Sequence, residues 1–215
     1  MSGEPDLVAR ASLPGERTAM DRSGFLRPPD PTADTRRLYD EDVADLGYVM
    51  NLTRLWAHQP ATADGLFDLM RRSLAGHGLT PRQRAVLVAA CASAFGDSYC
   101  SLAYGVRLAD AAGEEAAAGV LQGNDDGLTA AERALAGWAR KVARDPNHTG
   151  EADVQELRDA GFDDAMIFAI TVFVALRIAF STVNDALGAR PDAELGATAP
   201  PAVLGAVTFG RPISG

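Results

Sequence analysis

The stretch "LTPRQRAVLVAACASAFGDSYCSLAYG", residues 79–105, predicts two consecutive helices joined by a tight turn. Thr80 followed by Gln83, with a proline at the first helical position, has the pattern of a capping box. The run of small and β-branched apolar residues after it predicts a buried helix that ends at Gly96. Asp97 is then the expected N-cap of the next helix, because an aspartate side chain accepts hydrogen bonds from free N–H groups at a helix start.

Cys100 is expected at the third position of this second helix, where free N–H groups and the positive end of the helix dipole favour a thiolate. Asp97 lies three residues earlier, and its negative charge opposes that effect. Tyr104 lies one turn later on the same face, and its hydroxyl is a hydrogen-bond donor at neutral pH. Cys91 lies about two and a half helical turns before Cys100, so we expect no disulfide between them.

Helix signals dominate the rest of the chain, and strand signals are nearly absent. Thr129 and Glu132 form a second capping box, and a long apolar helix is expected from Asp164 to Leu187. The segments 81–95 and 164–176 are apolar on nearly all sides, so we expect both helices in the core. The pattern predicts an all-α fold of seven or eight helices with short connections.

The two ends of the chain differ from the middle in composition. Residues 1–37 are rich in proline, glycine and charge, which indicates a flexible N-terminal arm. Residues 189–215 carry prolines and glycines at a spacing that rules out long helices, which indicates an extended C-terminal tail. The sequence thus predicts one all-α domain over residues 38–188 with an irregular segment on each side.

The composition of the chain argues against some binding partners and favours one cellular compartment. The net charge of −9 argues against binding to nucleic acids and to anionic membranes. The chain starts without the pattern of a signal peptide, and its longest apolar run, residues 165–176, is shorter than a membrane span. Two cysteines form no disulfide framework, which suits a reducing cytoplasm. Basic residues are almost all arginine, which hints at a bacterial source with GC-rich DNA.

No metal or cofactor site is indicated. His58, His77 and His148 are far apart in the sequence and have no metal-ligand spacing. Neither a nucleophile elbow nor a serine–histidine pattern supports hydrolase chemistry. We therefore expect no metal and no cofactor.

Several segments in residues 45–190 carry a resemblance to a known family. They are "GYVMNLTRLWAHQP", the opening stretch, "RALAGWARKVARDP", "ADVQELRDAGFDD" and "VALRIAFSTVNDALG". With them the chain resembles the carboxymuconolactone decarboxylase family, and within it the alkylhydroperoxidase D-like, peroxidase-related branch. The resemblance implies an all-α alkylhydroperoxidase D-like domain that forms a homo-oligomer.

The same resemblance gives the positions of a possible active site. The redox members of the family carry a glutamate, a CxxC pair and a histidine. On this sequence those positions fall on Ala85, on Asp97 and Cys100, and on Tyr104, so the CxxC motif is degenerate. The candidate catalytic residues are therefore Cys100, Asp97 and Tyr104.

Three functions are compatible with these residues. The first is a thiol-dependent peroxidase in which Cys100 is oxidised to a sulfenic acid and rescued by an external thiol reductant. The second is a non-redox, decarboxylase-like enzyme for a small acidic substrate, with Arg177 as a cationic anchor. The third is a catalytically inactive oligomeric member of the family.

Arg177 interrupts an apolar helix, and a buried guanidinium needs a partner. We expect an ion pair with an acidic residue in the core or at a subunit interface. The alternative is that Arg177 holds the carboxylate of a ligand.

Overall fold

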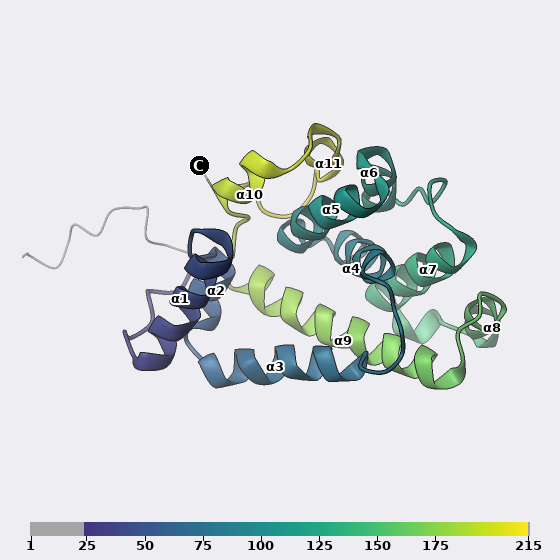
Figure 1. Ribbon diagram of the computed structural model, residues 1–215, viewed down its shortest axis with the longest axis horizontal. Helices are drawn as coiled ribbons and strands as arrows, with labels where there is room; N and C mark the ends of the chain where they lie inside the picture. The colour runs from purple at the N-terminus through teal and green to yellow at the C-terminus, as the bar shows by residue number, and fades with distance from the viewer. Residues whose placement is uncertain (1–23, 215) are drawn as a thin grey trace, which may run out of the picture.

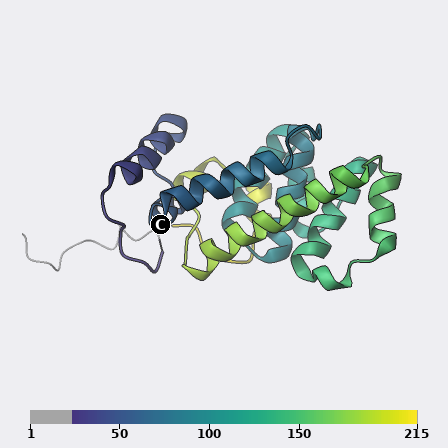
Figure 2. The ribbon, with the colours of Figure 1, turned by 90° about the horizontal axis from the view of Figure 1, so that it is seen from below.

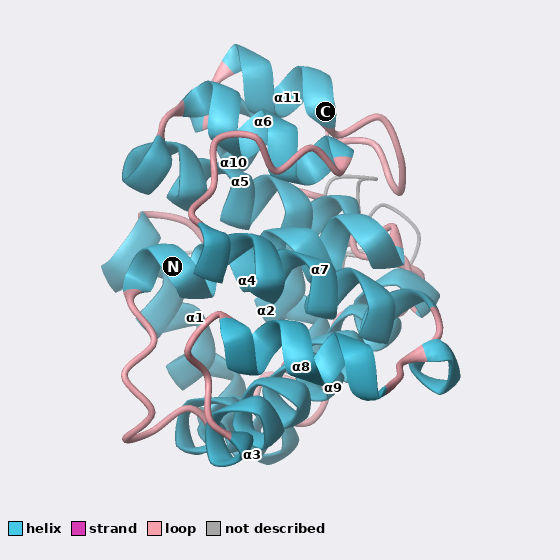
Figure 3. Ribbon diagram, turned by 90° about the vertical axis from the view of Figure 1, so that its right-hand side faces the viewer, coloured by secondary structure: helices cyan, strands magenta, loops and turns pink. Residues whose placement is uncertain are grey.

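The computed structural model describes residues 24–214 and shows an all-helical fold, as the sequence predicts. Within that part of the chain there are eleven α-helices and no β-strand (Figure 1, Figure 3). The helices are α1 (Ala33–Leu46), α2 (Asn51–Trp56), α3 (Pro60–Ser73), α4 (Pro81–Phe95), α5 (Ser98–Ala112), α6 (Glu114–Gln122), α7 (Ala130–Arg144), α8 (Glu151–Asp159), α9 (Asp164–Ala186), α10 (Ala193–Thr198) and α11 (Pro201–Ala206).

Helix α4 lies in the centre of the core, where it packs against α5 and α7 and also contacts α9 (Figure 1). All side chains of residues 85–92 in this helix are buried. The long helices α3 and α9 run side by side on one side of the molecule (Figure 2). The central place of α4 confirms the prediction made from its uniformly apolar sequence.

Both ends of α4 form as the sequence predicts: the capping box at its start and the turn that joins it to α5. The Thr80 hydroxyl accepts a hydrogen bond from the Gln83 N–H, and the Gln83 side chain accepts one from the Thr80 N–H. Gly96 ends α4 with a φ of 91°, in the left-handed region that glycine adopts without strain. Asp97 then caps α5 through a hydrogen bond from the Cys100 N–H.

Helix α9 is buried on one side only. Its bounds match the expected helix, but Phe168, Ala175 and Ala179 are exposed. The expectation that it lies wholly within the core is therefore wrong for this face. By length and composition alone α9 could cross a membrane, although half of its apolar window is buried against the rest of the protein.

The ends of the chain are more structured than predicted. Residues 1–23 and 215 lie outside the described residues. The predicted arm overlaps α1, which begins at Ala33, where the Thr32 side chain caps the helix. The predicted extended tail contains the short helices α10 and α11, and α11 packs against α5 and α6 (Figure 1). Proline and glycine limit the length of these helices but do not prevent them.

Beyond α11, the tail crosses the start of α5. The Ser98 hydroxyl contacts Arg211 twice, through the carbonyl at 2.8 Å and the N–H at 2.9 Å. Gly210 fits against this turn because a Cβ there would lie 2.7 Å from the Gly96 carbonyl oxygen. Nearer the start of the tail, the buried Asp192 carboxylate accepts a hydrogen bond from the Tyr99 hydroxyl. The tail is thus attached to the first turn of α5 at two points.

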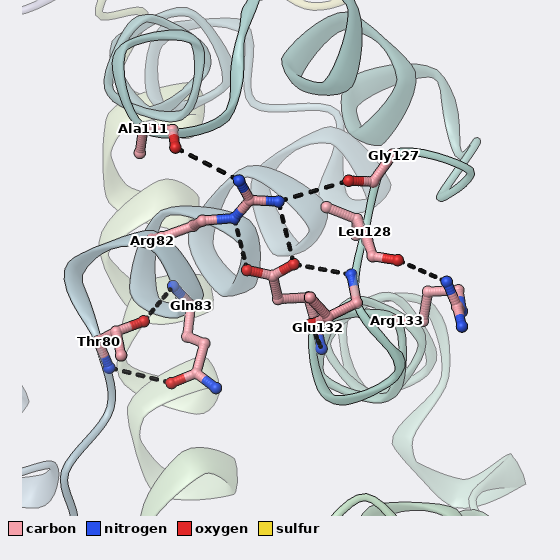
Figure 4. Close-up of polar contacts among 9 residues, drawn as sticks. Thr80, Arg82, Gln83, Ala111, Gly127, Leu128, Glu132 and Arg133 are labelled. Atoms are coloured by element: carbon pink, nitrogen blue, oxygen red, sulfur yellow. Dashed lines mark hydrogen bonds and ion pairs between the residues drawn. The ribbon is translucent and has the colours of Figure 1, made fainter.

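An ion pair between the part-exposed Arg82 and the buried Glu132 joins the start of α4 to the start of α7. Arg82 Nε donates to Glu132 Oε1 at 2.6 Å, and Arg82 also reaches the Ala111 and Gly127 carbonyl oxygens (Figure 4). Glu132 also accepts from the Thr129 N–H, so it completes the predicted capping box while holding Arg82. Burial acts to raise the pKa of Glu132, but the hydrogen bonds from Arg82 and Thr129 outweigh it and lower that pKa.

We predict that Glu132→Gln lowers the free energy of unfolding at pH 7 by about 1–3 kcal/mol, because the buried carboxylate loses charge-assisted hydrogen bonds. A carboxyl whose pKa is lowered on folding stabilises fully above its unfolded value, here 4.5, and loses that contribution as pH falls through the folded value. The difference between variant and wild type in urea unfolding should therefore shrink at about pH 3.

The matched control is Asp68→Asn, which removes a carboxylate paired with Arg71 and Arg72 at the surface. It should cost less than about 1 kcal/mol. Equal losses for the two variants, or a Glu132→Gln effect independent of pH, would contradict the structural role assigned to the Glu132 carboxylate.

Candidate functional site

The predicted site residues gather where the start of α5 meets α9. Asp97 is fully buried, and its Oδ1 accepts from the Cys100 N–H at 2.9 Å. Its Oδ2 accepts from the Ser181 hydroxyl of α9 at 2.5 Å. Cys100 is at the third position of α5, as predicted, and its side chain is 2% exposed. Asp97 is thus a cap that also ties two helices together.

Arg177 of α9 contacts the thiol directly. Its Nη2 donates to Cys100 Sγ at 3.2 Å, and the arginine side chain is buried. Among residues 24–214 no carboxylate lies within ion-pair distance of Arg177, so the expected ion pair within the chain is absent. The guanidinium Nε has no hydrogen-bond partner in that part of the chain either. Cys100 Sγ is thus the group that the guanidinium contacts directly, and the charge of the Asp97 carboxylate also stabilises the guanidinium.

Aromatic rings complete the surroundings of Arg177. Its Cζ lies 5.0 Å from the centre of the Tyr104 ring and 5.2 Å from that of Phe180. Arg107 also lies over the Tyr104 ring, at 4.8 Å. Tyr104 therefore joins the site as predicted, but it acts through its ring, which stabilises a cation by a cation–π interaction.

Burial decides the protonation state of Cys100. It raises the pKa of this thiol well above its ordinary range, and the charge and hydrogen bond of Asp97 act in the same direction. The Arg177 guanidinium and the Ser181 hydroxyl act to lower this pKa but do not compensate for burial. The helix dipole at this position favours the thiolate, but desolvation acts against it and leaves the pKa raised.

Cys91 is the second thiol near the site. It is buried in α4, and burial raises its pKa to about 12, while Arg177 acts to lower it. Both cysteines are free, as expected from their spacing. Ala85, where the resemblance implies a glutamate in redox relatives, is also buried in α4.

Two residues of the site were missed by the sequence analysis. Ser181 donates to Asp97, and Phe180 packs against Arg177. Their positions three and four residues after Arg177 place all three on one face of α9, which is the signal that could have revealed them.

The histidines do not contribute to the site. His58 contacts the Arg27 carbonyl oxygen at 3.0 Å, and His148 contacts Asp145. Residues 24–214 contain no group of three or more histidine, cysteine or acidic side chains able to hold a metal ion.

Comparison with known proteins places the fold. No protein-family model matches the chain, and no curated protein matches it. A solved alkylhydroperoxidase AhpD core, an uncharacterised peroxidase-related protein from Ralstonia eutropha JMP134, is 25% identical with a TM-score of 0.68, over 80% of this chain and 94% of that chain.

Two further structures share the fold at lower identity. A peroxidase-related protein from Silicibacter sp. TM1040 is 22% identical with a TM-score of 0.73, over 83% of this chain and 97% of that one. The debrominase Bmp8, in a complex with 2,3,4-tribromopyrrole, is 17% identical with a TM-score of 0.65, over 81% of this chain and 97% of that one. The chain therefore has an alkylhydroperoxidase D-like, all-helical fold, and proteins with that fold include a debrominase.

Proposed function

We propose that the protein is a thiol-dependent peroxidase in which Cys100 reacts with a hydroperoxide. The observation that carries the proposal is the contact between Arg177 and Cys100 Sγ. A buried guanidinium requires a counter-ion, and the thiolate form of Cys100 would supply it. The peroxidase-related names of two structures with the same fold are consistent with this activity.

The reaction can be written with the residues of the site. Asp97 accepts the thiol proton, and the thiolate, held by Arg177, attacks the terminal oxygen of the hydroperoxide. An S–O bond forms as the O–O bond breaks, so that Cys100 is oxidised to a sulfenic acid. The alkoxide leaves as an alcohol after it takes the proton from Asp97. Arg177 stabilises the negative charge that passes from sulfur to the leaving oxygen.

The cycle needs an external thiol reductant. One thiol condenses with the sulfenic acid, releasing water and forming a mixed disulfide with Cys100. A second thiol displaces Cys100 and leaves as the oxidised disulfide, which restores the resting thiol. Position 97 carries an aspartate, so the neighbouring cysteine that would resolve a CxxC site is missing.

A second candidate is a non-redox enzyme for a small acidic substrate. The specific observation in its favour is the buried Arg177 Nε, which has no partner among the described residues and could donate to a substrate carboxylate. In such an enzyme the activity would survive the loss of Cys100 and be lost with Arg177. If substitution of neither residue changed any activity, the protein would be the catalytically inactive oligomeric member of the family.

We also propose that the protein works in the cytoplasm as a homo-oligomer. The exposed face of α9, defined by Phe168, Ala175 and Ala179, is apolar and offers the surface for a second copy. Phe168 is 73% exposed, so contact with a second copy would remove a large apolar side chain from water.

We predict that the wild-type protein consumes cumene hydroperoxide with dithiothreitol as reductant and that Cys100→Ser abolishes this activity. Cys91→Ala is the matched control, since it removes the other buried thiol and should keep most of the activity. Arg177→Met should lower the rate at least about tenfold, because the thiolate loses its counter-ion. Peroxide consumption that is the same in wild type and Cys100→Ser would exclude the proposal.

We predict further that Asp97→Asn makes Cys100 more reactive. Asparagine caps a helix as well as aspartate does, but it removes a negative charge that raises the pKa of the thiol. In a Cys91→Ala background, iodoacetamide labelling of the native protein at about pH 8 should be several-fold faster for Asp97→Asn. In both forms the rate should still rise with pH, since burial keeps the thiol protonated. An unchanged rate in Asp97→Asn would show that the charge of Asp97 does not control the thiol, and a slower rate would show that Asp97 promotes ionisation of the thiol as a base more than it opposes it.

For the assembly, we predict that sedimentation velocity shows an oligomer for the wild type and a shift toward monomer for Phe168→Glu. A charge at this position would have to be buried against the partner copy. The control is Val43→Glu, which places the same charge at an exposed apolar position of α1. A monomeric wild type, or equal sedimentation of the two variants, would rule out this face as the interface.

A further inference from the structure

A pocket of about 280 Å³ lies between α1, α2 and α3, and one of its lining residues is Phe180, whose ring also contacts Arg177. Three aromatic rings line it. Phe180 stacks on Trp56 with ring centres 5.2 Å apart, and Phe67 meets Phe180 edge-on at 5.3 Å. Aliphatic side chains fill the gaps between the rings, so the pocket suits the apolar body of an organic molecule.

The polar groups of the same pocket are acidic. Glu41, Asp42 and Asp64 are among its lining residues, and no lysine, arginine or histidine is. Two of the three carboxylates, those of Glu41 and Asp64, form ion pairs with Arg37 at 2.9 Å and 2.6 Å. The side chains of Glu41 and Asp64 are about half exposed. An anionic ligand would be repelled here, whereas a cation would be attracted.

Asp42 is the carboxylate placed to receive a ligand. It is half-buried, and it accepts a hydrogen bond from the Met50 N–H, an uncharged group, at 2.9 Å. Burial raises the pKa of Asp42, and the negative charges of Asp45 and Glu41 act in the same direction. An ammonium group beside Asp42 would supply a compensating positive charge, and the aromatic rings would add cation–π attraction.

We propose that this pocket binds a small organic cation, namely an ammonium group on an aromatic or compact apolar body. The volume of the pocket suits a ligand with one six-membered ring and a short side chain. Asp42 binds the ammonium group, and Trp56, Phe67 and Phe180 contact the body. The proposal goes beyond the peroxidase function and does not depend on the reactivity of Cys100.

The test compares three probes that share a ring and a chain of similar length. They are 2-phenylethylammonium, the neutral 2-phenylethanol and the anionic phenylacetate, each titrated calorimetrically into the full chain. The ammonium should bind at least about tenfold more tightly than the alcohol, and phenylacetate should bind least. Affinity for the ammonium should increase with pH as Asp42 loses its proton.

Variants then assign the affinity to particular side chains. Asp42→Asn should weaken ammonium binding about tenfold while leaving 2-phenylethanol unchanged. Asp40→Asn, which removes an exposed carboxylate of the same helix outside the pocket, should change neither. Phe67→Ala truncates a half-exposed ring and should weaken both ligands without unfolding the protein.

Equal affinity for the ammonium and the alcohol, no binding of any probe, or equal effects of Asp42→Asn and Asp40→Asn would overturn the proposal. Cys100→Ser should bind the ammonium like the wild type. Loss of peroxidase activity and loss of cation binding therefore test two separate claims.

Discussion

The buried Asp97 carboxylate is the constraint on which the site depends. A carboxylate without solvent is tolerated only when its oxygens accept hydrogen bonds. One oxygen accepts from the Cys100 N–H and the other from the Ser181 hydroxyl, so satisfying Asp97 fixes the start of α5 against α9. The same contacts bring Arg177 to the sulfur of Cys100. Asp97 thus organises the surroundings of the Cys100 thiol and at the same time disfavours its ionised form.

Local features were predictable from the sequence because they depend on neighbouring residues. The capping boxes at Thr80 and Thr129 and the caps at Asp97 and Gly96 all appear where their patterns indicate. The contact between Arg177 and Cys100 spans 77 residues and depends on how α9 crosses α5, which no local pattern specifies.

Burial was the main quantity that the sequence could not supply. The position of Cys100 at a helix start is visible in the sequence, and it favours a thiolate. Whether water reaches Cys100 depends on how distant parts of the chain, such as α9, pack around it. A helix start alone would lower the pKa of the thiol, whereas the exclusion of water raises it. The ends were misjudged for a related reason, since the short helices α10 and α11 contain few residues and pack against α5 and α6.

One turn of α9 serves both proposed sites. Arg177 and Ser181 face the thiol, while Phe180 lies between the guanidinium and the aromatic pocket. The two sites are chemically different, one built around a sulfur and a cation, the other around a carboxylate and apolar rings. A rotation of the Phe180 side chain would change the walls of both.

The attachment of Arg211 to Ser98 has a consequence for biosynthesis. Arg211 lies 113 residues after Ser98, yet it packs on the helix turn that carries Cys100. During translation the first turn of α5 can make these contacts only after Arg211 has been synthesised and has left the ribosome. Chains that stop before Arg211 would therefore lack both hydrogen bonds to the Ser98 hydroxyl.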